Sequence, residues 1–344
     1  MNSTAKSRIL SAIAALWLAI SSSFSSSAND WTADILGNGY LMTTINMPDD
    51  YSGKVKCTVV KKMAAAGSHK AVLYVHGYND YFFQAEEGNQ FVKHGYNFYA
   101  VDLRKYGRSL LPGQTKFEVR SIEEYFADIN AAMDIITADG NTSIILMGHS
   151  TGGLTSACYM ASNAGSKYPI KALLLNSPFL DMNLSSFNEN IAVPLVSWIS
   201  PVFKNIEIEQ GGNNNYAQSL LRKYHGDWDY NTQWKLEVSP AVTSSWLGAI
   251  HKAHVFIQKG ASIQCHILLM RSDKSVGGDS WNDSLSRGDG VLDVNDISRY
   301  GRRLGQHITE FIVKDGLHDL FLSRKPVRDA LYINVFNWLS ANNL

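Results

Sequence analysis

Apolar residues occur in short runs that alternate with longer segments of helical spacing over most of the chain. The runs are rich in Val, Ile, Leu and Tyr, and several are almost continuous, as expected for strands covered on both faces. The predicted strands span residues 55–61, 71–75, 97–103, 143–148, 172–176, 266–270 and 308–313. Residues 122–138 carry apolar side chains at helical spacing, and residues 327–339 form a predicted closing helix. This alternation predicts an α/β fold in which a mostly parallel sheet is flanked by helices.

The alternation stops between about residues 181 and 247, where the chain is rich in Asn, Trp and Tyr and no strand pattern recurs. Residues 191–203 are mostly apolar but are interrupted by Pro194 and Pro201. We interpret residues 181–247 as a cap inserted over the sheet, within one domain that spans residues 29–344. A chain of 344 residues is long enough for one such domain with an insertion.

The N-terminus has the pattern of a secretory signal peptide. Lys6 and Arg8 precede an apolar stretch over residues 9–20, and a Ser-rich segment then ends at Ala28. The apolar stretch is too short to span a bilayer as a helix. We therefore predict a leader over residues 1–28 and export to the periplasm or the medium. The alternative is a membrane anchor formed by an uncleaved leader.

Composition and charge exclude several classes of protein. Lys plus Arg equals Asp plus Glu, with 31 of each, so the chain lacks the basic footprint of a nucleic-acid-binding protein. Cys57, Cys158 and Cys265 are odd in number and follow no disulfide pattern, so buried free thiols are expected. The sequence has no Walker loop, no dinucleotide fingerprint and no zinc-ligand spacing, and we expect neither a cofactor nor a metal.

A candidate nucleophile lies in residues 148–153, Gly-His-Ser-Thr-Gly-Gly. This segment follows the predicted strand 143–148 and precedes a helical pattern over 154–164. A G-x-S-x-G sequence between a strand and a helix is the nucleophile elbow of α/β-hydrolases. The turn is sharp, so side chains at Gly148 and Gly152 would collide with neighbouring backbone, and the helix N-terminus favours a developing negative charge. Ser150 is the predicted nucleophile.

The oxyanion hole and the general base follow from the positions of two other loops. His76-Gly77-Tyr78 ends the strand 71–75, and the loop at that point supplies one backbone amide to the oxyanion in this fold. We assign the amides of Tyr78 and Thr151. His318 follows the last predicted strand, from where it can reach Ser150 as the general base.

Two carboxylates compete for the role of the triad acid. Asp273 comes almost directly after the strand 266–270, whereas Asp289 comes just before a helical pattern over 294–304. The acid of this fold usually precedes that helix, so we favour Asp289 and read 273–288 as a loop insertion, with Asp273 as the alternative. The chain order of Ser150, acid and His318 is that of the α/β-hydrolases.

Together these segments resemble the monoacylglycerol lipase and lysophospholipase-like group of α/β-hydrolases, also labelled serine aminopeptidase S33 or Hydrolase_4. The matching pieces are His76-Gly77, Asp102-Leu103-Arg104, Gly107-Arg108-Ser109, Gly148 to Gly153 and Gly316 to Asp319, and they span roughly residues 71–339. The resemblance implies the α/β-hydrolase fold and the hydrolysis of carboxylic esters. The chain departs from the group by its leader, by the insertion 273–288 and by the bulky Tyr78 after the His-Gly pair.

We therefore expect a serine hydrolase that cleaves esters of lipid-like substrates, of the monoacylglycerol or lysophospholipid type, through an acyl-enzyme. The expected partners are small acyl esters and, transiently, a lipid surface that the apolar cap would touch. One alternative is an aminopeptidase-like amidase, which would need a carboxylate for the substrate amine, such as Glu207, Glu209 or Asp227. A second alternative is a non-catalytic binding protein on the same fold.

Overall fold

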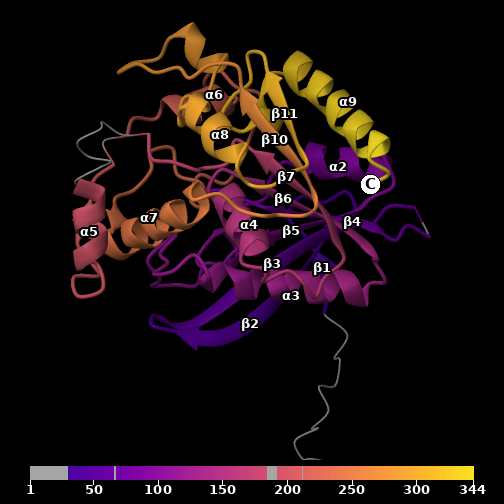
Figure 1. Cartoon of the computed structure of the whole chain (residues 1–344), viewed down its shortest axis with the longest axis horizontal. Coiled ribbons are helices and arrows are strands. Elements are labelled where there is room, and N and C mark those ends of the chain that lie inside the picture. The colour runs from indigo at the N-terminus through magenta and orange to yellow at the C-terminus, as the bar shows by residue number, and fades with distance from the viewer. Residues whose placement is uncertain (1–29, 66, 184–191, 211) are drawn as a thin grey trace, which may run out of the picture. The chain divides into compact units, whose positions relative to one another are not determined.

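The computed structural model describes residues 30–65, 67–183, 192–210 and 212–344 (Figure 1). The chain divides after Thr32, and Ala33–Leu344 form one compact unit. The predicted leader over residues 1–28 lies outside the described residues. In the part of the chain that is described, no helix has both the length and the apolar character needed to cross a membrane.

The central sheet runs in the order β2-β3-β5-β4-β6-β7-β10-β11. Its strands are β2 (Leu41–Asp50), β3 (Gly53–Lys62), β4 (Lys70–Val75), β5 (Asn97–Asp102), β6 (Ser143–His149), β7 (Ile170–Asn176), β10 (His266–Ser272) and β11 (Ile308–Val313), and the two-residue β1 (Thr32–Ala33) precedes them in the chain. Strands β5, β4, β6, β7, β10 and β11 are parallel, whereas β3 is antiparallel to both β2 and β5. The predicted α/β class with a mostly parallel sheet is confirmed.

Helices cover both faces of this sheet (Figure 1). They are α2 (Ala85–Lys93), α3 (Glu124–Ala138), α4 (Thr151–Ala161), α5 (Val193–Ile199), α6 (Asn215–Leu220), α7 (Ser244–Gln258), α8 (Val294–Gly301) and α9 (Lys325–Ala341). Phe91 of α2 and Val335 of α9 share one buried cluster with Val72 and Met147 of the sheet. Helices α3 and α4 lie on the opposite side (Figure 1). Burial on both faces explains why the central strands read as continuous apolar runs.

Residues 181–247, here called the cap segment, lie between β7 and the second turn of α7, and their described part contacts the loops that follow β4 and β11. They contain α5, α6 and two short strands, β8 (Glu207–Ile208) and β9 (Val242–Thr243), which pair antiparallel. The expectation that no strand recurs here is therefore wrong, because two-residue strands leave no periodic pattern in the sequence. Cys57 and Cys158 are buried free thiols, and Cys265 is free and half-buried.

Candidate active site

Ser150 lies in the tight turn between β6 and α4. Its φ of 52° and ψ of −120° place a non-glycine residue in a sparsely populated region. Such a conformation costs on the order of 1–3 kcal/mol and persists only when its surroundings hold it. The Ser150 amide donates to the Asn176 carbonyl at 3.1 Å, and the Phe179 amide donates to the Ser150 carbonyl at 3.0 Å. The end of β7 therefore holds the strained residue in place.

The glycines of the elbow are required by close backbone approach. A Cβ on Gly148 would lie 2.5 Å from the Gly152 carbonyl oxygen, and one on Gly152 would lie 2.3 Å from the carbonyl oxygens of Val75 and His76. Neither contact is sterically possible without moving α4 or β4. The two glycines thus let α4 begin directly after Ser150, with Thr151 as its first residue.

The loop that follows β4 lies against Ser150. A Cβ on Gly77 would lie 3.0 Å from Ser150 Cβ and 3.3 Å from His149 Cδ2. The His76 ring fixes this loop, because its Nε2 accepts from the Leu103 amide at 3.0 Å and its Nδ1 lies 2.8 Å from the Gly77 carbonyl. The structure thereby places the backbone just before Tyr78 next to Ser150.

His318 and Asp289 form a buried pair. Nδ1 of His318 lies 3.0 Å from Oδ2 of Asp289, and the two residues are 3% and 0% exposed. The other oxygen, Oδ1 of Asp289, accepts from the amides of Val291 at 2.8 Å and Leu292 at 2.9 Å. An ionised carboxylate only accepts, so the proton of the neutral ring sits on Nδ1 and Nε2 is left as a base.

Asp273, the alternative acid, has different partners. Its Oδ1 accepts from the Asp315 amide at 2.8 Å, and its Oδ2 lies 3.8 Å from Lys274 Nζ. The insertion explains this arrangement, because Val276 and Lys274 exchange backbone hydrogen bonds with Asp289 at 2.8 and 2.9 Å. The loop closes on itself there and returns Asp289 to the end of β10. The structure brings His318 to Asp289 and not to Asp273.

The segments around Asp102 stabilise the loops near the site. Asp102 accepts from the amides of Phe82 at 3.0 Å and Arg108 at 2.9 Å, and from the Arg108 guanidinium at 2.8 Å. Gly107 has a φ of 44°, and a Cβ there would lie 2.4 Å from Asp102 Oδ2. These motif residues therefore fix the loop after β4 and do not face Ser150 as reactive groups.

Several side chains around His318 were not predicted. The ring of His149, the residue before Ser150, lies 4.8 Å from that of His318, and the Tyr216 ring lies edge-on to His318 at 5.6 Å. The Tyr216 hydroxyl accepts from the Asp319 amide at 3.3 Å. Burial lowers the pKa of His149, although the Asp319 carboxylate acts against this shift. In the sequence, His149 and Asp319 could be linked to the site only because they neighbour Ser150 and His318. No sequence pattern linked Tyr216 to the site.

Within the described residues, Asp80, His149 and Asp319 offer ligand atoms that lie within 4.8 Å of one another. All three are buried, and Oδ2 of Asp80 and Oδ2 of Asp319 accept no hydrogen bond. Lys235 Nζ lies 2.8 Å from Oδ1 of Asp80. A side-chain ammonium therefore already supplies a positive charge to this cluster.

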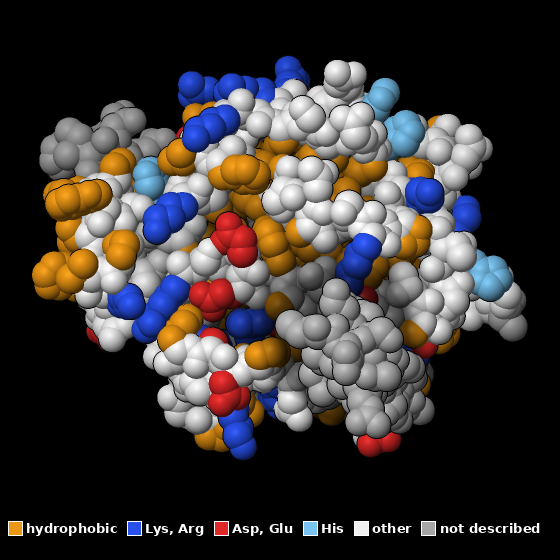
Figure 2. All heavy atoms as spheres, turned by 60° about the horizontal axis from the view of Figure 1, so that its bottom comes forward, with side chains coloured by type: hydrophobic (Ala, Val, Ile, Leu, Met, Phe, Trp, Pro, Cys, Tyr) orange, Lys and Arg blue, Asp and Glu red, His pale blue; other side chains and the backbone are white. Residues whose placement is uncertain are grey.

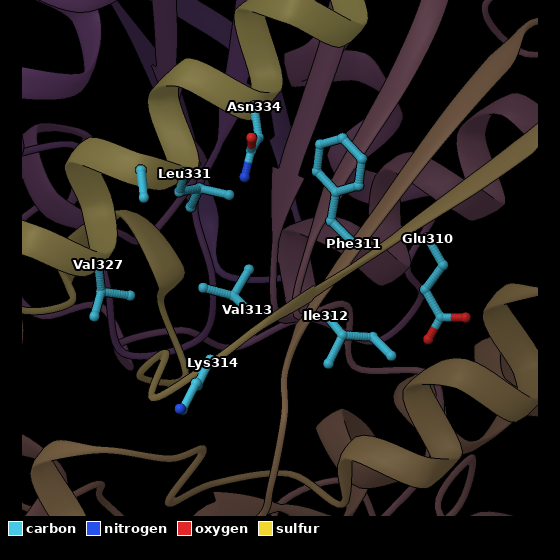
Figure 3. Close-up of a pocket in the computed structure, with 9 residues that line it drawn as sticks. Glu310, Phe311, Ile312, Val313, Lys314, Val327, Leu331 and Asn334 are labelled. Atoms are coloured by element: carbon cyan, nitrogen blue, oxygen red, sulfur yellow. The ribbon is translucent and has the colours of Figure 1, made fainter.

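A hollow of about 290 Å³ lies between β11 and α9 (Figure 3). Figure 3 shows Phe311 and Val313 on the strand and Leu331 and Asn334 on the helix around it. None of the residues that line it belongs to the candidate site. It is therefore separate from the chemistry of Ser150.

Comparisons with known proteins give one matching family and several solved structures of similar fold. The family described as serine aminopeptidase, S33 (Hydrolase_4), matches residues 66–275. No curated protein matches the chain. A monoglyceride lipase variant from Saccharomyces cerevisiae, solved with a substrate analogue, has a similar structure, with 15% identity, a TM-score of 0.61 and coverage of 87% of this chain and 96% of that chain.

Two further solved structures share the fold. A carboxyl esterase from Bacillus coagulans, solved with glycerol, has 11% identity and a TM-score of 0.62, and the match covers 88% of this chain and 99% of that chain. A monoacylglycerol lipase from Paleococcus ferrophilus has 17% identity and a TM-score of 0.54, with the same two coverages, 88% and 99%. At these identities the similarity establishes the fold.

Proposed function

Because the chain belongs to the serine aminopeptidase S33 family of hydrolases, we propose that it cleaves carboxylic esters of lipid-like substrates through an acyl-enzyme on Ser150. One observation carries the proposal. A serine in a strained strand-to-helix turn lies next to the loop at Gly77, and a histidine hydrogen-bonded to a buried carboxylate lies 4.8 Å, ring to ring, from the residue before that serine. A serine in such a turn and a histidine oriented by a buried carboxylate are groups that nucleophilic acyl transfer uses.

In the proposed mechanism, His318 Nε2 takes the proton of the Ser150 hydroxyl as the oxygen attacks the acyl carbonyl. The amides of Tyr78 and Thr151 stabilise the oxyanion, and Asp289 stabilises the imidazolium. His318 then gives the proton to the alcohol that leaves. Water, deprotonated by His318, attacks the acyl-enzyme; the bond between the acyl carbon and the Ser150 oxygen breaks, and His318 returns the proton to that oxygen as the carboxylic acid leaves.

The lipid-like substrate class is supported by the cap surface. Leu195, Trp198, Val202 and Phe203, in and after α5, have 57%, 79%, 77% and 56% of their surface exposed. Figure 2 shows apolar side chains gathered at its left edge, the side on which α5 lies in Figure 1. Large apolar side chains exposed together favour contact with a lipid surface or an acyl chain. The similar structures include a monoglyceride lipase and a monoacylglycerol lipase.

The amidase alternative takes its support from the family description, serine aminopeptidase. It requires a carboxylate that receives the substrate amine. Glu207 and Glu209 are exposed, and Asp227 pairs with Arg328 at 3.0 Å. None of these carboxylates is buried beside His318, so the ester hydrolase is the better supported function.

The test is hydrolysis of p-nitrophenyl esters, from acetate to palmitate, beside amino-acid p-nitroanilides. We expect ester cleavage by the wild type, with Ser150→Ala inactive, and little cleavage of the anilides. Preference for the anilides would favour the amidase. If the wild type cleaves neither and does not react with a fluorophosphonate probe, the chain is a binding protein on this fold.

A further inference from the structure

The four residues that follow Gly77, here called the oxyanion loop (residues 78–81), are each held by the cap segment. The Tyr78 ring packs on Trp246 at 4.8 Å. Asn79 forms two hydrogen bonds with the backbone of Leu236, at 2.9 and 2.7 Å. The Tyr81 hydroxyl accepts from the Asn231 amide at 2.8 Å. The cap segment is therefore joined to the loop that carries a predicted oxyanion amide.

The remaining contact in this series is a buried ion pair. Lys235 Nζ lies 2.8 Å from Oδ1 of Asp80, and the two side chains are only 6% and 2% exposed. Burial alone would raise the pKa of Asp80, but the Lys235 ammonium lowers it below its ordinary value. A buried ion pair contributes little net stability compared with apolar packing, so its presence calls for another explanation.

Aromatic rings surround the same ammonium. Lys235 Nζ lies 5.6 Å from the centroid of Tyr216 and 5.8 Å from those of Phe83 and Tyr230. Rings at such distances attract a cation through their negative faces. Lys235 is thus fixed by one carboxylate and three rings, in a site that admits little movement.

Two of these partners support different parts of the candidate site. Asp80 is part of the oxyanion loop, two residues after Tyr78. Tyr216 packs edge-on against His318 and accepts a hydrogen bond from the Asp319 amide. The Lys235 ammonium therefore contacts Asp80, in the loop of the predicted oxyanion hole, and Tyr216, which packs on the predicted base.

We infer that Lys235 is a positioning residue, whose ammonium holds the oxyanion loop through Asp80 and the His318 loop through Tyr216. The inference rests on the proposed function, since it assigns Lys235 to the alignment of that same site. Lys235 touches neither Ser150 nor the acyl group in this role. Its loss should therefore slow the chemical step without weakening the binding of substrate.

The first test compares Lys235→Met with Lys223→Met in the hydrolysis of p-nitrophenyl butyrate. Lys223 lies in the same segment, and its ion pair with Glu237 is on the surface, with the lysine side chain 53% exposed. We expect Lys235→Met to lower kcat about 10- to 100-fold with little change in KM, because small misplacements of reacting groups cost this much. Lys223→Met should behave as wild type. Asp80→Asn, which keeps the shape of the side chain, should reproduce the loss.

The second test is chemical rescue, which a purely structural role would not show. The side-chain atoms that Lys235→Ala removes are those of n-propylammonium. This cation should therefore restore part of kcat, and n-propanol, which carries no charge, should not. The rate at which a fluorophosphonate labels Ser150 should fall and recover in parallel, while circular dichroism reports the folded fraction at the assay temperature.

Full activity of both Lys235→Met and Asp80→Asn would overturn the inference, as would rescue by n-propanol as effective as that by the cation. A loss of kcat that only follows the unfolded fraction would overturn it as well. These outcomes leave the proposed function intact, because the wild type still cleaves the ester. A wild type that neither cleaves esters nor reacts with the probe removes the proposed function, and the inference with it.

Discussion

Asp289 and Asp273 have the same side chain, and their surroundings give them different chemistry. Asp289 is fully buried, with one oxygen on two backbone amides and the other on His318 Nδ1. Asp273 is partly exposed, with 28% of its side-chain surface accessible, and it holds the turn at Asp315. Asp273 and Asp289 both follow β10 in the sequence. Only the position of Asp289 just before α8 favoured it as the acid.

The contrast gives a prediction at the scale of the residue. In Asp289→Asn an amide that donates to Nδ1 favours the tautomer with its proton on Nε2, so kcat should fall by about 10⁴-fold. The KM for p-nitrophenyl butyrate should change little. Asp273→Asn is the matched control and should keep wild-type kcat. A large loss in the control, or an active Asp289→Asn, would contradict the assignment of the acid.

At the scale of elements, helix α7 is tied to the chain that follows β7. Nε2 of His254 donates to the Phe179 carbonyl at 2.8 Å, and Gln258 donates to the Leu180 carbonyl at 2.9 Å. His254 is 2% exposed, and burial lowers its pKa to about 4, while the bond to Phe179 and the nearby Asp181 oppose the shift. The Phe179 amide also donates to the Ser150 carbonyl, so α7 helps to hold the turn at Ser150 through Phe179.

This contact predicts how stability depends on pH. An unfolded histidine titrates near 6.5, so between that pH and 4 the unfolded chain binds the proton and the folded chain does not. The stabilisation that neutral His254 contributes to the folded state is fully present above pH 6.5 and is lost as the pH falls toward 4. Between about pH 7.5 and about pH 5 this amounts to roughly 2 kcal/mol in the free energy of unfolding.

The measurement is urea unfolding of the wild type and His254→Gln at both pH values. The glutamine amide can still donate to the Phe179 carbonyl but does not titrate. We expect the stability of the wild type to fall more steeply toward low pH than that of the variant. Identical pH dependence in the two proteins would show that His254 does not carry this linkage.

The central strands that the sequence predicted share one physical property, burial on both faces. They are continuous apolar runs, so β4, β5, β6 and β10 were located to within two residues. Strand β2 was missed because it is buried on part of one face only, and its sequence mixes Thr, Asn and Asp with apolar residues. Helix α2 was missed for a similar reason, since it buries only Glu87, Gly88 and Phe91.

At the scale of the molecule, local motifs predicted the fold and the places of Ser150 and His318, whereas no motif pointed to the contacts that support the candidate site. Ser150 and His318 stand in short segments at the ends of strands, which sequence order reveals. Lys235 and Asp80 lie 155 residues apart in the chain and meet only because the cap segment folds over the oxyanion loop. Contacts of this kind leave no periodic signal, so a single sequence cannot show them.

The apolar surface of the cap and the zero formal net charge suggest how the whole molecule would meet a lipid surface. Without an excess of basic residues, attraction to the surface must come from apolar contact, which salt screens little. Trp198, with 79% of its surface exposed, is the largest side chain available for that contact. Ile333 of α9 is 63% exposed and offers a matched control away from the cap.

We therefore expect Trp198→Ser to bind phosphatidylcholine vesicles more weakly than the wild type in co-sedimentation, at low and at high salt. Activity on an emulsified long-chain monoacylglycerol should fall with binding, while activity on soluble p-nitrophenyl butyrate should not change. Ile333→Ser should match the wild type in all three measurements. If Trp198→Ser binds vesicles normally, the cap surface serves packing or another partner, and the lipid-surface part of the proposal fails while the ester hydrolase remains.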